Sequence, residues 1–112
     1  MNVQLRARPK PDSRGGDRRA HRRFETEEPA LAIIGNVAAA CRLSDISLGG
    51  ALLEGSLPLE DGQIFALCIL DLPEISARAV HCGDGFTGIQ FLEATRHRNA
   101  IGLWIRRRMS GK

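Results

Sequence analysis

Residues 64–92 read IFALCIL DLPE ISARAVHC GDG FTGIQFL: three apolar runs separated by two segments rich in turn-forming residues. The runs have the length and composition of β-strands, and the glycine, proline and aspartate between them favour tight turns. In the last run, alternation predicts that Ile89 and Phe91 face the core while Gln90 faces solvent. The predicted strands are Ile64–Leu70, Ile75–Cys82 and Phe86–Leu92.

The same pattern extends upstream of residue 64. Pro29–Ile34 and Val37–Ile46 are predicted as strands joined by a turn at Gly35–Asn36. A second turn at Ser47–Gly50 leads into a short strand at Ala51–Leu53. Short strands with turn signals about every ten residues are typical of an antiparallel barrel or sandwich.

The carboxy-terminal segment has a different periodicity. Between Ala94 and Met109 the apolar residues are spaced three or four apart, which predicts an amphipathic helix. Trp104 is the expected anchor of this helix on the barrel. The apolar positions are Ile101, Trp104, Ile105 and Met109, and the arginines on other faces include Arg98, Arg106 and Arg107.

Charge is distributed unevenly along a chain whose 112 residues suit a single domain. Residues 1–23 hold eight basic and two acidic residues, residues 24–95 hold two basic and eleven acidic residues, and residues 96–112 hold six basic and no acidic residues. We therefore expect anions to be bound by the ends rather than by the body. Residues 1–16 are polar and rich in proline and glycine, which predicts a flexible arm ahead of a domain at 17–112.

Localisation follows from what the sequence lacks. The longest apolar run, Ile64–Leu70, is far shorter than a membrane span, and the amino terminus has no apolar stretch of the signal-peptide type. Cys41, Cys68 and Cys82 lie far apart inside apolar stretches, which favours buried free thiols in a reducing compartment. We expect a cytoplasmic protein.

Residues 17–24, DRRAHRRF, contain four arginines. Side chains four residues apart lie on the same side of the backbone in both helical and extended conformations. Arg19 and Arg23 therefore form a two-pronged fork. Arg18 and Arg22 form a second one. Guanidinium groups suit phosphate oxygens and the guanine edge, so the cluster indicates an anion site, with a solvated basic linker as the alternative.

A second motif, DISLGG at residues 45–50, lies between two predicted strands. Aspartate and serine favour turns, and consecutive glycines let a ligand approach the backbone closely. The Asp45 carboxylate is an acceptor that suits the N–H donors of a guanine. An ordinary β-turn is the alternative for this segment.

Taken together, the two motifs resemble those of the PilZ domain family, the bacterial receptors for cyclic di-GMP. The resemblance consists of an R-x-x-x-R fork, a strand, and D-x-S-x-x-G at the end of a strand. It extends from Asp17 to about Arg108 and includes Gly88–Phe91, which is similar to the family's late G-[VI]-x-F strand. It implies a six-stranded antiparallel β-barrel at about 24–93 and a closing C-terminal helix at about 94–109.

The resemblance also implies which residues bind the ligand. The family has an apolar residue after its last arginine, so Phe24 identifies Arg23 as that arginine; the role of Arg22 stays open. The implied ligand is cyclic di-GMP, bound as the arginine-bearing arm orders over the barrel, and the output passes to an effector protein. No cofactor, metal or catalytic residue is implied. The implied ligand-binding residues are Arg18, Arg19, Arg23, Asp45, Ser47, Gly49 and Gly50.

Other function classes have less support. A Ser–His–Asp site would need a histidine near Ser47, and the three histidines lie in no nucleophile motif. The cysteines and His81 lack the paired spacing of a zinc site. The acidic body and the few aromatics oppose a nucleic-acid-binding barrel, so a PilZ-fold interaction adaptor that binds no nucleotide is the main alternative. Arg106–Arg108 are interpreted as a solvated helix end, with a partner contact left open.

Overall fold

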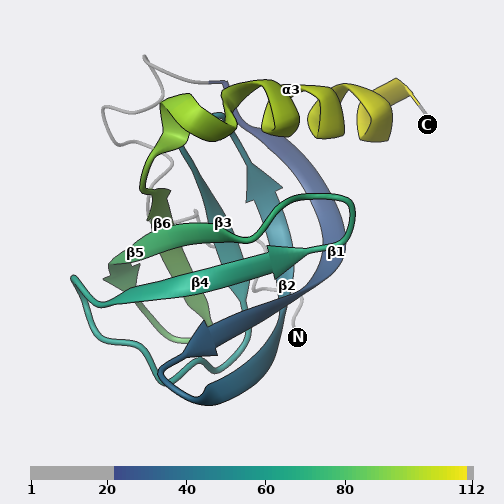
Figure 1. The fold of residues 1–112 in the computed structure, drawn as a ribbon. Coiled ribbons are helices and arrows are strands. Elements are labelled where there is room, and N and C mark those ends of the chain that lie inside the picture. The colour runs from purple at the N-terminus through teal and green to yellow at the C-terminus, as the bar shows by residue number, and fades with distance from the viewer. Residues whose placement is uncertain (1–21, 111–112) are drawn as a thin grey trace, which may run out of the picture.

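The computed structural model describes residues 22–110, which form a closed barrel of six antiparallel strands capped by one helix (Figure 1). This confirms the predicted six-stranded barrel with a carboxy-terminal helix. No helix within these residues is both long and apolar enough to span a membrane. The elements are β1 (Phe24–Ile34), β2 (Val37–Ile46), β3 (Gly50–Glu54), β4 (Ile64–Ile69), β5 (Ile75–Cys82), β6 (Phe86–Phe91) and α3 (Ala94–Ser110).

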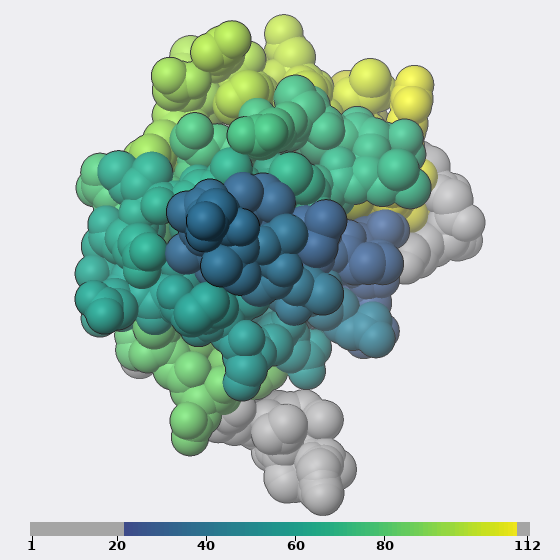
Figure 2. All heavy atoms as spheres, turned by 60° about the horizontal axis from the view of Figure 1, so that its bottom comes forward, coloured from purple at the N-terminus to yellow at the C-terminus, as the bar shows by residue number. Residues whose placement is uncertain are grey.

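The strands follow the order β1-β2-β3-β6-β5-β4 around the barrel. β1 closes it by pairing with β2 along one edge and with β4 along the other. In Figure 1, α3 lies across one end of the barrel. Figure 2 brings the opposite end forward, where the blue spheres of β1 and β2 fill the centre of the face and the yellow-green spheres of α3 lie at the upper edge.

β1 begins earlier than its sequence pattern predicts. The predicted start was Pro29, whereas the strand starts at Phe24, because Phe24 pairs with Ile46 and Glu25 with Asp45 on β2. A register shift between Glu25 and Glu28 interrupts the alternation in this part of the strand. The glutamates therefore interrupt the apolar pattern from which a strand is predicted, and the start of β1 is defined by its pairing with β2.

The interior of the barrel is filled mainly by aliphatic side chains. As predicted, Ile89 and Phe91 are buried while Gln90 between them is exposed. Leu43 and Leu67 are completely buried in the same core. The alternation therefore identifies the inner side of the late strands directly from the sequence.

The cysteines differ from the expectation of buried thiols. Cys41, Cys68 and Cys82 are free, and each is only half-buried. Cys68 pairs with Leu31 of β1, and its neighbours Leu67 and Ile69 face the core, so Cys68 lies on the outer side of the barrel. An apolar run on an antiparallel strand thus includes residues of both faces.

Trp104 attaches α3 to the barrel. Its side chain is buried, and its Nε1 donates a hydrogen bond to the Leu70 carbonyl oxygen at 3.0 Å. The Arg108 guanidinium lies over its ring, 4.4 Å from the centroid, and also donates to Glu28 of β1 at 2.9 Å. The predicted anchoring role of Trp104 is confirmed, with Arg108 as a second attachment.

We expect Trp104→Ala to lower the free energy of unfolding by about 3–5 kcal/mol, because it leaves a large cavity beneath α3. Trp104→Phe keeps most of the packing and loses the hydrogen bond to Leu70, so it should cost clearly less. Urea denaturation of the two variants beside the wild-type protein measures both values. Equal losses for the two variants would show that ring packing does not hold the helix in place.

Candidate functional site

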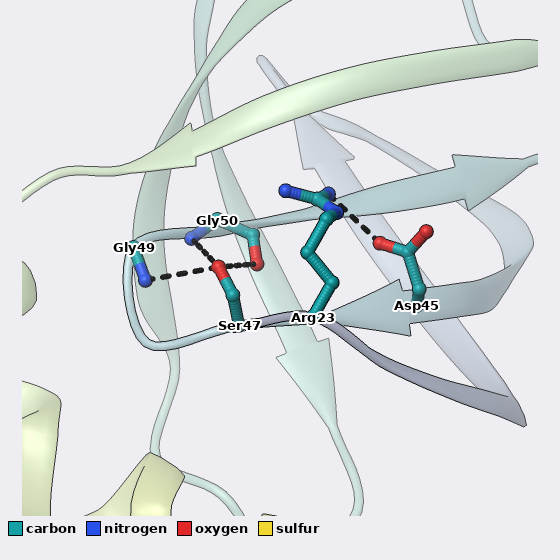
Figure 3. Close-up of polar contacts among 5 residues, drawn as sticks. All are labelled: Arg23, Asp45, Ser47, Gly49 and Gly50. Atoms are coloured by element: carbon teal, nitrogen blue, oxygen red, sulfur yellow. Dashed lines mark hydrogen bonds and ion pairs between the residues drawn. The ribbon is translucent and has the colours of Figure 1, made fainter. Parts of the chain in front are cut away.

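The two sequence motifs meet through an ion pair between Arg23 and Asp45 (Figure 3). The Arg23 Nη2 lies 2.8 Å from the Asp45 Oδ1, although the residues are 22 positions apart in the chain. The Asp45 side chain is 4% exposed and that of Arg23 is 19% exposed. The last arginine of the first motif is therefore fixed against the first residue of the second.

The position of Asp45 follows from its place at the end of β2. Ile46, the next residue, is in the core, so Asp45 points to the outer side of the strand. Register shifts lie close by in both pairings of β2, between Glu25 and Glu28 of β1 in the β1–β2 pairing and between Leu43 and Asp45 of β2 in the β2–β3 pairing. Such bulges re-aim side chains, and they are frequent beside functional sites.

The turn at Ser47–Gly50 is organised by the Ser47 side chain. Its hydroxyl oxygen accepts hydrogen bonds from the amides of Gly49 and Gly50, both at 3.2 Å, and its hydroxyl donates to the Gly50 carbonyl at 3.3 Å (Figure 3). The Ser47 amide donates to the same carbonyl at 2.8 Å. Ser47 is buried, and its bonds are those of a turn-forming residue.

Both glycines of the turn lie against β6. Gly50 pairs with Gln90, and a Cβ added to Gly50 would lie 2.3 Å from the Ile89 carbonyl oxygen. The Gly49 carbonyl accepts from the Phe91 amide at 2.9 Å. Close approach of two backbones therefore requires glycine at position 50.

Leu48 connects the turn to α3, a role that the sequence did not assign to it. It packs against the core cluster, and its Cδ2 lies 3.8 Å from where a Cβ on Gly102 would be. An apolar residue inside a polar, glycine-rich turn is a sequence signal for burial. The element it packs on is not visible in the sequence, because Gly102 lies far along the chain.

The remaining arginines of the first motif divide into two groups. The Arg22 guanidinium lies over the Phe24 ring, 5.2 Å from its centroid, and the side chain is exposed. Arg18 and Arg19 were predicted to bind the ligand, and both lie outside the described residues. The structure thus brings together Arg23, Asp45, Ser47, Gly49 and Gly50 of the predicted set.

Two thiols among the described residues are difficult to ionise. Burial raises the pKa of Cys41 to about 11. The pKa of Cys82 is raised by burial first, then by the hydrogen bond and charge of Asp61 and the charge of Glu60. Both thiols therefore stay protonated near neutral pH. Within residues 22–110, no three His, Cys, Asp or Glu side chains are grouped to hold a metal ion.

Comparison with known proteins bears on this arrangement of motifs. A sequence model of the PilZ domain matches residues 17–107. The chain belongs to the PilZ domain family. The matched span contains all seven predicted ligand-binding residues, including Arg18 and Arg19. No curated protein matches the chain in sequence.

Solved structures share the PilZ fold with this chain. One is the PilZ domain of CeSA from a cellulose-synthesizing bacterium, with a TM-score of 0.61, 19% identity, and coverage of 74% of this chain and 93% of that chain. Another is an uncharacterised protein of Legionella, with a TM-score of 0.58, 16% identity, and coverage of 80% and 95%, respectively. At these sequence identities the two structures show a shared fold and nothing more specific.

The requirement for glycine at position 50 can be tested by the same substitution at two sites. Gly50→Ala should lower the free energy of unfolding by at least about 2 kcal/mol, because the methyl group collides with the β6 backbone. Gly102→Ala, inside α3 and at ordinary contact distance from Leu48, should raise it by about 0.5–1 kcal/mol. Chemical denaturation measures both. Equal effects at the two positions would contradict the packing of the turn on β6.

Proposed function

We propose that this PilZ domain is a receptor for cyclic di-GMP, which binds where Arg23, Asp45 and the Ser47–Gly50 turn meet. The observation that carries the proposal is the 2.8 Å ion pair between Arg23 and Asp45. It joins, on one outer surface of the barrel, the last arginine of one motif with the carboxylate of the other. Family membership supplies the ligand class.

The chemistry of these groups suits a guanine dinucleotide. A guanidinium carries several N–H donors, so Arg23 can hold Asp45 and contact a phosphate oxygen at the same time. A carboxylate accepts more than one hydrogen bond, so Asp45 can receive guanine N–H groups while it is paired. The glycines of the turn carry no side chain between the ligand and the backbone.

The arm then completes the site. The resemblance implies that the arginine-bearing arm, with Arg18 and Arg19, orders over the barrel when the ligand binds. Arg23 pairs with Asp45 in the structure. We therefore assign the ligand-dependent ordering to Arg18 and Arg19. These two add further phosphate contacts to the one made by Arg23. The ordered arm gives an effector protein a surface to bind.

Calorimetric titration tests the proposal directly. We expect cyclic di-GMP to bind the wild-type protein with micromolar or higher affinity, and GTP to bind much more weakly. Each arginine of the site should contribute about 1.5–3 kcal/mol, or roughly 10- to 150-fold in affinity, so Arg19→Ala/Arg23→Ala should abolish measurable binding. The endpoint also gives the number of ligand molecules per domain.

Arg42→Ala is the matched control, because Arg42 is an exposed arginine of β2 outside the site. It should bind cyclic di-GMP as the wild-type protein does. Arg19→Lys keeps the charge and loses the planar fork, so it should still weaken binding. A folded wild-type protein that releases no heat with cyclic di-GMP would contradict the receptor function and favour the nucleotide-independent adaptor.

A further inference from the structure

The outer side of α3 carries a concentration of positive charge. The helix contains five arginines and no acidic residue. Its inner side is apolar, with Ile101, Trp104 and Ile105 buried. The outer side has exposed arginines and one exposed leucine, Leu103, whose exposure is 44%. We call this group the α3 outer face: Arg98, Leu103, Arg106 and Arg107.

Arg108 does not belong to this face, although it follows directly after Arg106 and Arg107. It is 22% exposed, pairs with Glu28 at 2.9 Å and with Asp71 at 3.6 Å, and lies over the Trp104 ring. Within residues 22–110, no member of the α3 outer face takes part in an ion pair. The three consecutive arginines therefore have two roles, with Arg108 structural and its two neighbours directed to solvent.

The helix dipole accounts for only part of this pattern. Cations in the last turn interact favourably with the partial negative charge at the helix carboxy terminus, which suits Arg107. Arg98 lies in the second turn of α3, where this effect is absent. Leu103 gains nothing from the dipole, and its exposure costs free energy in water. Arginine, in contrast, is enriched at protein–protein interfaces relative to the rest of the surface.

The charge of the barrel selects among anionic partners. Residues 24–95, which include the whole barrel, carry two basic against eleven acidic residues. A membrane surface or a nucleic-acid duplex is wide enough to face this acidic barrel as well as α3, which is unfavourable. A protein surface can instead contact α3 alone, with acidic groups for the arginines and an apolar pocket for Leu103.

The α3 outer face is also connected to the candidate ligand site. Gly102 lies in the middle of α3 and precedes Leu103 of the outer face directly. Leu48 of the Ser47–Gly50 turn packs at this glycine. A displacement of the turn would therefore shift the middle of α3 relative to the barrel.

We propose that the α3 outer face docks an acidic protein surface with an apolar pocket at its centre, and that Leu48 makes this docking depend on ligand binding at the Ser47–Gly50 turn. The proposal of a docking surface is supported by the charge and the exposure of the α3 side chains. Its dependence on ligand rests on the receptor function proposed above.

Phage-displayed peptides of random sequence, selected on the immobilised full chain in the presence of cyclic di-GMP, provide the probe. Enriched peptides should combine Asp and Glu with Leu, Ile or Phe. In fluorescence-anisotropy titrations, Arg106→Glu/Arg107→Glu should weaken their binding at least about tenfold, because like charges then face each other. Leu103→Ser should also weaken it. Vesicles of phosphatidylcholine with phosphatidylglycerol, and a short DNA duplex, are the competing probes.

Matched controls come from the barrel. Arg42→Glu/Arg78→Glu reverses two exposed arginines, and Ile64→Ser removes an exposed apolar side chain, all outside α3. These variants should bind the peptides as the wild-type protein does. Three results would overturn the proposal. The enriched peptides could lack acidic residues, or they could bind the α3 variants as tightly as the wild-type protein. Vesicles or DNA could also bind more tightly than the peptides through the same arginines.

The two parts of the proposal fail separately. In one outcome the protein binds cyclic di-GMP, but peptide binding at α3 does not change with the nucleotide. This would overturn the coupling through Leu48 and would still support the docking surface. If calorimetry shows no cyclic di-GMP binding while selection without nucleotide still yields acidic peptides that need Arg106 and Arg107, the receptor function fails and the docking surface is supported. Leu48→Ala should retain peptide binding and lose its ligand dependence.

Discussion

Pairing of the first residues of β1 with the last residues of β2 positions most of what surrounds the candidate site. Phe24 lies opposite Ile46 and Glu25 opposite Asp45, which brings the preceding residue, Arg23, within 2.8 Å of the Asp45 carboxylate. Removing one partner of such a largely buried ion pair leaves an uncompensated charge, so the contact favours this register over shifted ones. The arginine motif thereby enters the barrel at a defined point, beside the turn that carries the second motif.

A series of contacts connects this point to α3 at the other end of the described chain. The Ser47–Gly50 turn is braced internally by Ser47, joined to β6 through the Gly49 carbonyl, and packed on α3 through Leu48. Arg108 connects α3 back to Glu28 of β1. A ligand at the Arg23–Asp45 pair would therefore contact a turn that already reaches the helix, which gives a small PilZ domain a physical route from nucleotide to partner.

Much of the fold and part of the site could be predicted from the sequence, for identifiable reasons. Alternation of apolar and polar residues predicted which side of β6 faces the core. Helical spacing predicted Trp104 as the anchor of α3. The resemblance to PilZ domains predicted Arg23 and Asp45 as site residues. The start of β1 was missed because glutamates mask a strand that its partner defines. Burial of Cys68 was wrong because an apolar run contains residues of both faces. The inward position of Arg108 depends on Glu28, 80 residues away, and no local pattern encodes such a contact.

The proposed receptor function depends on ligand binding where β1, β2 and the Ser47–Gly50 turn meet. Two-dimensional ¹H–¹⁵N NMR of the full chain during a titration with cyclic di-GMP locates the bound nucleotide residue by residue. The account predicts that the largest shifts fall on the amides of Arg23 and of Asp45–Gly50, with smaller shifts spreading to α3 around Gly102. Saturable shifts confined to other strands, with the amides of Asp45–Gly50 unchanged, would contradict it.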